Sequence, residues 1–453
     1  MTTAADHPEL ELRARTPGVA AMRVEDLNGR TAMVVRIDSS RRKGALAPID
    51  GETLAEAART ALDQRLPLVM FMASSGADAH EGVAALHGWG RAARVLTRCS
   101  GAVPLIFIID GPTVSGSALL LGLGDVIIMT ADAYAFVSGA DAVRRLTGVL
   151  VDNAELGGAQ MHAAASGVAT LVVADLDEAE STAAEILSFL PDHTDLLPPL
   201  QPTSDPVDRP TPEAAALIPA EPTGSYDVRE VAAEILDDGY FLELRSQWAP
   251  NLVTLLGSLG GRSIGVVANQ PLALAGTLDI TASQKGARFV AFCDAFNLPL
   301  LTMVDTPGFY PGKDLEWRGM IRHGAQLAFA YARATVPRLG LVLRKSYGGA
   351  YIVMDSKTMG NDLCLAWPSA EIAVMGARQA AEILRRRAEP SEREEFVLEY
   401  EDRYLNPWVG AERGLIDMVV DPAETRKVLC EALDLLASKR EELPERRHDN
   451  TPL

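Results

Sequence analysis

Short apolar runs recur along the chain and alternate with longer, alanine-rich stretches. Most runs end near glycine, proline or aspartate. Such runs are typical of strands buried on both faces of a largely parallel sheet, and the stretches between them predict helices. The pattern therefore predicts an α/β protein. The predicted strands are 31–37, 66–73, 103–110 and 125–129 in the first half, and 263–269, 298–305, 336–344 and 371–376 in the second.

A proline-rich segment divides this pattern into two parts. Nine of the 27 prolines fall within residues 191–222. Proline at that density prevents regular helix and sheet, so the segment is interpreted as a semi-extended linker or a wrapping segment. We expect an N-terminal domain at 1–190, a proline-rich linker at 191–224 and a C-terminal domain at 225–453.

The two halves match each other weakly but in order. Chance would give one or two matches, whereas an ordered series at nearly constant spacing indicates an internal duplication. The matched positions are 27–30 with 259–262, Gly44 with Gly276, Gly76 with Gly308 and, after one inserted residue, Gly116 with Gly349.

In each repeat a turn of small residues follows the third strand and opens a helix, at 115–118 and at 348–351. Amides at a helix start have no acceptor within the helix, and the helix dipole favours negative charge there. Small side chains let a ligand oxygen approach these amides closely. The turns therefore predict two oxyanion holes. Small residues at such turns also serve backbone geometry alone, and the pattern leaves that alternative open.

Charge and length exclude several classes of function. The chain has 453 residues, and 42 Lys and Arg against 61 Asp and Glu give a net charge of −19. That balance argues against nucleic acid and against anionic membranes, but a local basic cluster can still bind an anionic small molecule. No run approaches the roughly 18 apolar residues of a membrane span, and the first residues lack the apolar core of a signal peptide. We expect a cytoplasmic protein.

Other catalytic motifs and metal ligands are not found in the sequence. The four cysteines (Cys99, Cys293, Cys364 and Cys430) are far apart, with no histidine at metal-ligand spacing beside them. We therefore expect no metal site and no disulfide framework. The motifs of P-loop, serine-esterase and dinucleotide-binding proteins are missing. Ser117 could be a nucleophile, but no histidine lies at a spacing that suggests a base.

Dense motifs in the second half resemble a known family. They are YDVRE at 226–230, the run 265–312 that ends in DTPGFYPG, RHGAQLAFAYARATVP at 322–337, RKSYGGAYIVMDSK at 344–357, AWPSAEIAVMGA at 366–377 and LNPWVGAERGLID at 405–417. These residues resemble the carboxyltransferase (beta) subunit of biotin-dependent acyl-CoA carboxylases, of the propionyl-CoA or acetyl-CoA carboxylase type. The first half resembles that family more loosely, through 81–83, 155–159 and 162–167.

The resemblance implies a fold and an assembly. It implies two tandem crotonase-like (ClpP/crotonase) ββα-superhelix domains, the N-terminal one for the acyl-CoA thioester and the C-terminal one for biotin. It also implies a homo-oligomer, a hexamer built as a trimer of dimers, whose active sites are shared between subunits. The implied partner is the biotin carboxylase and biotin carboxyl carrier (alpha) subunit.

The resemblance also assigns site residues. The family's oxyanion pairs fall on Gly116 and Ser117 in the N-terminal domain, and on Gly349 and Ala350 in the C-terminal domain. The cofactor itself acts as the base, so no catalytic histidine or glutamate is needed. CoA carries phosphate charges, so this acidic chain needs local cations, and the candidates are Arg41, Arg42 and Lys43 beside Gly44; a solvated charge run is the alternative. The other candidate binding residues are Gly76, Gly276 and Gly308 in the repeated loops, Gly348 and Tyr351 in the second turn, and Ile352, which falls where the family lines its acyl pocket.

Three features of the first half depart from the family. Only about twenty residues precede Val24, Asp78 follows Ser75-Gly76-Ala77 where the family commonly has arginine, and a Gly-Gly pair has become Gly116-Ser117. We expect the Ser117 hydroxymethyl group to crowd the acyl site.

These observations together predict an activity. It is carboxyl transfer from carboxybiotin on a carrier domain to the α carbon of acetyl-CoA or propionyl-CoA, which gives malonyl-CoA or methylmalonyl-CoA. The alternatives are a decarboxylase or transcarboxylase acting on a malonyl-type thioester, and a non-catalytic assembly partner.

Overall fold

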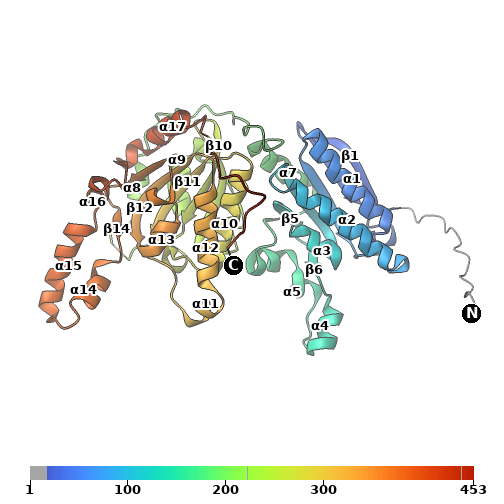
Figure 1. Ribbon diagram of the computed structural model, residues 1–453, viewed down its shortest axis with the longest axis horizontal. Helices are drawn as coiled ribbons and strands as arrows, with labels where there is room; N and C mark the ends of the chain where they lie inside the picture. The colour runs from blue at the N-terminus through green and yellow to red at the C-terminus, as the bar shows by residue number, and fades with distance from the viewer. Residues whose placement is uncertain (1–17, 222, 440, 453) are drawn as a thin grey trace, which may run out of the picture.

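The computed structural model describes residues 18–221, 223–439 and 441–452. Two lobes lie side by side, each with one mainly parallel sheet covered by helices (Figure 1). The N-terminal lobe holds the elements up to α7, and the C-terminal lobe holds those from α9 onward.

The N-terminal sheet has the order β1-β2-β3-β4-β5-β7, and β6 pairs with β4. Among the strands described, β1 and β2 alone run antiparallel in this sheet, and its other pairs are parallel. The strands are β1 (Ala20–Leu27), β2 (Arg30–Ile37), β3 (Leu68–Ser74), β4 (Leu105–Val114), β5 (Val126–Thr130), β6 (Tyr134–Phe136) and β7 (Leu171–Val173).

Helices cover both faces of this sheet. On one face α1 and α2 pack together so closely that a Cβ at Gly51 would lie 2.2 Å from the Gly88 carbonyl carbon. On the other face Val34, Phe71 and Ile106 join one apolar core with α7 and with Phe289 and Phe292 of α10 in the C-terminal lobe. That shared core joins the two lobes. The helices are α1 (Pro48–Gln64), α2 (Val83–Cys99), α3 (Gly116–Leu121), α4 (Ala140–Thr147), α5 (Asn153–Gly157), α6 (Ala159–Met161) and α7 (Leu176–Phe189).

The C-terminal sheet repeats this plan. Its order is β15-β13-β12-β11-β10-β9-β8, and β14 pairs with β12. The strands are β8 (Phe241–Glu243), β9 (Leu252–Leu259), β10 (Arg262–Asn269), β11 (Leu300–Thr306), β12 (Arg338–Tyr347), β13 (Leu363–Ala366), β14 (Glu371–Ala373) and β15 (Met418–Val419). The helices are α9 (Val228–Ile235), α10 (Ile280–Ala295), α11 (Lys313–Trp317), α12 (Met320–Arg333), α13 (Gly348–Val353), α14 (Ala377–Leu384), α15 (Pro390–Tyr404), α16 (Pro407–Glu412) and α17 (Thr425–Leu435).

Each of the eight predicted strands coincides with an observed one, and β14 is only three residues long. The predicted duplication and the tandem crotonase-like arrangement are confirmed by the matching strand orders and by structural relatives reported below. Two arms, α4 and α14 with α15, project to the same side of the molecule (Figure 1).

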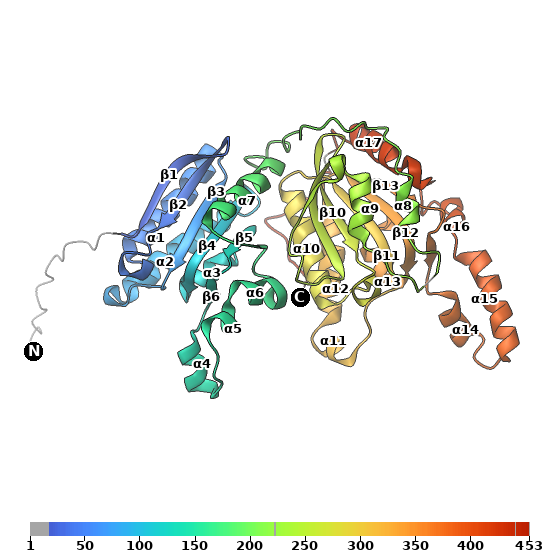
Figure 2. The ribbon, with the colours of Figure 1, turned by 180° about the vertical axis from the view of Figure 1, so that it is seen from behind.

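The proline-rich segment runs along the C-terminal lobe, as Figure 2 shows from behind, and includes the short helix α8 (Glu213–Ala216). The prediction of no regular helix was therefore wrong at these residues, which no proline interrupts. Gln201 N donates to Gly261 O at 2.7 Å, and the buried Thr211 hydroxyl donates to Pro422 O at 2.6 Å. Arg426, itself fully buried, donates to Pro206 O at 3.0 Å. The segment is therefore a strap bonded to the domain, which we call the proline strap (residues 191–221).

Candidate active site

Two loops of the same shape lie beside the carboxyl ends of the strands, one in each repeat. Gly44 and Gly276 close short 3₁₀ turns at φ 67° and 72°. A Cβ would lie 2.1 Å from Ala73 O at Gly44 and 2.5 Å from Asp305 O at Gly276, so neither position accepts a side chain.

These loops bring the next predicted glycines into place. Leu46 N donates to Gly76 O at 2.8 Å in the first repeat, and Leu278 N donates to Gly308 O at 3.1 Å in the second. The four glycines at 44, 76, 276 and 308 thus form two equivalent loop pairs.

The small-residue turns follow β4 and β12. Gly116 and Ser117 begin α3, and Gly349 and Ala350 lie in the first turn of α13. Their amides have no acceptor within these helices, which leaves them available to an external oxygen. The structure places the four predicted oxyanion residues in these two turns, on different sheets of the chain.

Ser117 does not crowd the acyl site. Its side chain is 1% exposed, and its hydroxyl donates back to Val114 O at 2.7 Å. The exposed residue of that turn is Ser115, which has φ 62° and ψ −130° and no side-chain capping bond. The expectation of a projecting Ser117 hydroxymethyl group was therefore wrong, because Ser117 points into the core.

An aromatic side chain covers each turn. Trp89 Nε1 donates to Gly116 O at 2.6 Å, and a Cβ at Gly116 would lie 3.2 Å from that indole ring. A Cβ at Gly349 would lie 3.6 Å from the Phe309 ring. Sequence reasoning missed both rings, since each comes from a segment remote from its turn.

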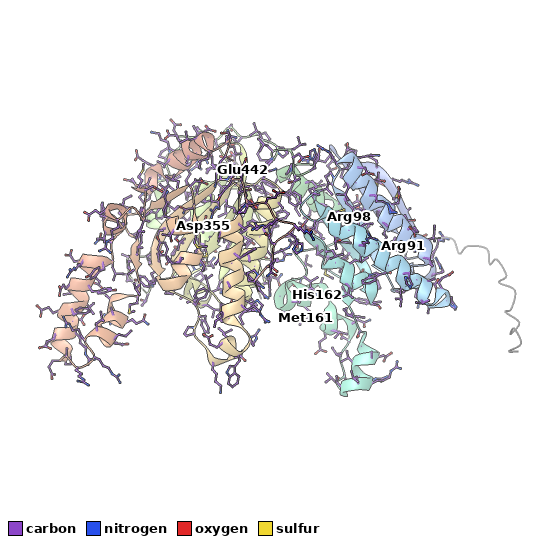
Figure 3. The ribbon with its side chains drawn as sticks, viewed as in Figure 1. Arg91, Arg98, Met161, His162, Asp355 and Glu442 are labelled. Carbon is purple, nitrogen blue, oxygen red and sulfur yellow. The ribbon has the colours of Figure 1, made fainter. Side chains whose placement is uncertain are left out.

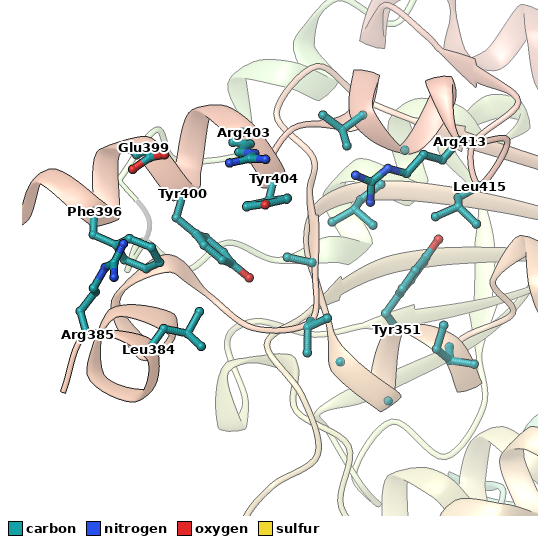
Figure 4. Close-up of a pocket in the computed structure, with 18 residues that line it drawn as sticks. Tyr351, Leu384, Arg385, Phe396, Glu399, Tyr400, Arg403, Tyr404, Arg413 and Leu415 are labelled. Carbon is teal, nitrogen blue, oxygen red and sulfur yellow. The ribbon is translucent and has the colours of Figure 1, made fainter. Parts of the chain in front are cut away.

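A cavity of about 770 Å³ opens beside the C-terminal turn (Figure 4). It brings together the predicted Gly348, Gly349, Tyr351 and Ile352 with residues of α16 and of the arm formed by α14 and α15. Apolar and aromatic side chains predominate along its walls. The labelled lining residues are Tyr351, Leu384, Arg385, Phe396, Glu399, Tyr400, Arg403, Tyr404, Arg413 and Leu415.

Protonation beside this turn is set mainly by burial. Burial and a hydrogen bond to Glu371 raise the pKa of Tyr347, and burial raises the pKa of Tyr351. Both phenols therefore stay neutral. Burial and the neighbouring Arg344 lower the pKa of Lys345.

The predicted basic cluster is only partly available to a ligand. Arg42 pairs with the carboxylate of the buried Asp78 and lies 3.9 Å from Asp50. Arg41 donates to Gly18 O at 2.9 Å. Lys43 is exposed and, within the described ranges, makes no ion pair. Lys43 is therefore the most available cation of the three.

A histidine near the lobe boundary has a structural role. His162 Nε2 lies 2.7 Å from Ala135 O and Nδ1 lies 2.7 Å from the Ser166 hydroxyl. Because a carbonyl only accepts, Nε2 carries the proton and Nδ1 accepts from Ser166. Figure 3 shows His162 and Met161 on the side of the N-terminal lobe that faces the other lobe.

Residues 18–221, 223–439 and 441–452 contain no group of three or more His, Cys, Asp or Glu able to hold a metal ion. Among the same residues, no helix has the length and apolar character needed to cross a membrane.

Two repeated sheets, each with a turn of small residues that opens a helix after the third parallel strand, define a protein of the tandem crotonase-like class. A family model described as "Carboxyl transferase domain" matches residues 24–451. The chain therefore belongs to the carboxyl transferase family and is a carboxyltransferase subunit.

Relatives and solved structures agree with that family. The chain is 44% identical to the propionyl-CoA carboxylase beta chain of Saccharopolyspora erythraea, over 94% of this chain and 82% of that protein. It is 42% identical to the methylmalonyl-CoA carboxyltransferase 12S subunit of Propionibacterium freudenreichii, over 94% and 82%. A crystal structure of a transcarboxylase 12S hexamer with hydrolysed methylmalonyl-CoA matches with a TM-score of 0.94 at 40% identity, covering 96% of this chain and 85% of that one.

Proposed function

We propose that this chain moves a carboxyl group between biotin on a partner's carrier domain and the α carbon of a short acyl-CoA. In the carboxylating direction acetyl-CoA or propionyl-CoA would give malonyl-CoA or methylmalonyl-CoA. The observation that carries the proposal is the pair of equivalent amide turns, of which the C-terminal one opens into an apolar cavity. The names of the relatives at 44% and 42% identity agree with it.

In the N-terminal domain, Gly116 and Ser117 would donate their amides to the thioester oxygen as negative charge develops there. Fixed donors of this kind need no reorganisation during reaction, which makes them effective in a site that excludes water. Trp89 holds the Gly116 carbonyl and so orients the peptide unit between the two donors. Lys43, beside the Gly44 and Gly76 loops, is the proposed contact to the CoA phosphates.

In the C-terminal domain, the cavity fits an uncharged bicyclic ring. Tyr351 and Ile352 supply apolar walls, and Gly349 lines the cavity directly before the buried Ala350. Bound carboxybiotin supplies the carboxyl group and the base that takes the α proton. This chain positions that ring, donates two amide hydrogens to its oxygen and excludes water.

The two turns lie on different sheets, and we infer that they meet across a subunit boundary in a homo-oligomer. The exposed apolar side chains of the projecting arms support this, among them Leu146 at 89% exposure and Leu150 at 78%. The solved relative is a hexamer. The further partner proposed is the alpha subunit that carries biotin carboxylase and the biotin carboxyl carrier.

One alternative has a specific observation behind it. The relative named methylmalonyl-CoA carboxyltransferase favours transfer of a carboxyl group from a malonyl-type thioester. The amide turns serve both directions, since a donor that stabilises the shared intermediate stabilises it from either side.

Purified chain incubated with malonyl-CoA or methylmalonyl-CoA and free biotin tests the proposal. We expect biotin-dependent loss of the CoA-bound carboxyl group. With a biotinylated carrier, a biotin carboxylase, ATP and bicarbonate, we expect the forward reaction. Complete inactivity in both assays would contradict an enzymatic role and favour an assembly partner.

A further inference from the structure

A buried polar cluster lies directly before the C-terminal turn. Asp305, the residue before the end of β11, is 1% exposed, and its carboxylate accepts from three donors. They are the Tyr226 hydroxyl at 2.9 Å, Arg344 Nε at 3.1 Å and the Lys345 amide at 3.1 Å. Arg344 is 5% exposed and also donates to Gly224 O at 3.0 Å.

The cluster sits on a bulge in β12. Pairing between β11 and β12 shifts register between Val304 with Val342 and Thr306 with Ser346. The extra residues of β12 include Arg344 and Lys345, and Asp305 lies opposite them. A bulge re-aims the strand that follows it, and here that strand leads through Tyr347 into Gly348.

The N-terminal repeat makes an equivalent bulge without an ion pair. Its register shifts between Met72 with Ile109 and Ser74 with Thr113. The residues matching Asp305 and Arg344 are Ala73 and Gly111, and a Cβ on Gly111 would lie 3.4 Å from the Ala73 methyl carbon. The fold thus forms this bulge with two small residues, so the buried charges are not required for the strand path itself.

Buried ion pairs are costly to desolvate and give little net stability against apolar replacements. Stability alone therefore does not account for the pair of Asp305 with Arg344, and a role in fixing local geometry is the hypothesis to test. Burial beside Asp305 raises the pKa of Tyr226 well above its ordinary value, so the phenol stays protonated and donates. Every member of the cluster is hydrogen-bonded, which makes such a network rigid.

We propose that Tyr226, Asp305 and Arg344 are positioning residues that fix the Gly348–Ala350 turn for biotin. The inference deepens the proposed function and rests on it. The cluster locks the carboxyl ends of β11 and β12 to residues 224–226, so the two amides that face biotin stay aimed at one point. The acyl-CoA turn in the other repeat has its own bulge and does not depend on the cluster.

The test compares three variants in the reaction of free biotin with a malonyl-type CoA ester. For Asp305→Asn and Arg344→Met we expect kcat to fall about 10- to 100-fold with a raised KM for biotin, because small misplacement of oriented groups costs rate on that scale. Tyr226→Phe removes one hydroxyl and keeps the ring, so it folds and should lose several-fold in kcat/KM for biotin. The KM for the CoA ester should change less than about twofold in all three.

The buried pair of Arg426 with Asp237, at 2.6 Å, provides the matched control, and Arg426 belongs to α17, which Figures 1 and 2 show apart from α13. Arg426→Met should lower the melting temperature without separating the two KM values. The positioning role is refuted if Tyr226→Phe and the charge variants behave like Arg426→Met, or if both KM values rise together. If the unmodified chain fails to react with biotin at all, the proposed function itself is wrong.

Discussion

Ser115 and Gly348 occupy equivalent places in the two repeats, each directly before the residues that present the predicted amides, and they share the left-handed backbone, with φ of 62° and 61°. Glycine adopts this conformation freely, whereas a serine there is strained by about 1–3 kcal/mol. The N-terminal turn therefore adopts the same positive φ at a cost that the C-terminal turn avoids.

Ser115→Gly should raise the free energy of unfolding by about 1 kcal/mol, because it removes that strain. Denaturant titration of the variant measures the change. The control is Ser117→Gly, which removes a buried hydroxyl bonded to Val114 O and should destabilise the protein by about 1 kcal/mol. Equal effects of the two substitutions would contradict the assignment of strain to Ser115.

Gly349→Val should abolish biotin-dependent transfer and leave the affinity for the CoA ester within about twofold. The new side chain would start 3.6 Å from the Phe309 ring and fill the cavity edge where the amides are presented. The substitution keeps the amide but blocks access to it, and the loss of one oxyanion interaction costs about 100- to 1,000-fold in kcat. A parallel loss of CoA-ester binding would mean that the roles of the two domains are reversed.

Lys43 and Arg42 should respond differently to the loss of their charge. Lys43→Gln should raise the KM for the CoA ester several-fold, with a larger effect at low salt, since its ammonium is exposed. Arg42→Gln should instead lower the free energy of unfolding by about 1–3 kcal/mol, because it leaves the buried Asp78 carboxylate without that partner. Kinetics at about 50 mM and about 300 mM salt, where the Debye length is roughly one-half and one-fifth of its 30 Å value at 0.01 M, measure the effect of Lys43→Gln. Thermal melts measure the effect of Arg42→Gln.

Lys285 should make stability increase with pH above neutrality. Its ammonium donates to the carbonyls of Arg245 and Trp248 at 2.9 and 3.0 Å, and burial lowers its pKa to about 7 from 10.5. Between about pH 7 and pH 10.5 the unfolded chain holds a proton on Lys285 that the folded chain has lost. The contribution of Lys285 to the free energy of unfolding therefore rises by up to about 1.4 kcal/mol per pH unit. Below pH 7 the full penalty of the buried charge applies. The free energy of unfolding of the protein minus that of Lys285→Met should therefore increase when both are measured from about pH 6.5 to about pH 9.5. A difference that does not change with pH would contradict the lowered pKa.

Leu146 and Leu150 should help to hold subunits together. Replacement of both by aspartate should reduce the particle mass in light scattering toward the 48.4 kDa of a single chain. Leu435 ends α17 in the other lobe and is 84% exposed. Leu435→Asp is the control and should leave the mass unchanged. A single-chain mass for the unmodified protein at micromolar concentration would overturn the shared-site proposal.

The sequence allowed the central strands to be predicted because they are buried on both faces. β3 is buried along its whole length, and it was predicted from its apolar run alone. β1 was missed, since half-exposed residues interrupt its pattern. Both small-residue turns were predicted from the duplication, because Gly116 matches Gly349 between the repeats.

Long-range contacts could not be predicted in the same way. The partners Asp305 and Arg344 are far apart in the chain, and their N-terminal counterparts Ala73 and Gly111 carry no charge that would have signalled the pair. The strain at Ser115 was also missed, although comparison with Gly348 at the same repeat spacing would have found it.

The contacts of the proline strap determine where the polypeptide chain could be cut. Asn297 holds the carbonyls of Thr194 and Leu196, and Gln201 is bonded to Gly261, so both sides of Leu197 are anchored to the C-terminal lobe. A protease that cut at this exposed leucine would leave two fragments still joined by the apolar core that α7 shares with α10. The same position would allow one gene to be divided into two whose products assemble. A C-terminal fragment begun at residue 225 would instead leave the Arg426 guanidinium without the Pro206 carbonyl that it now binds.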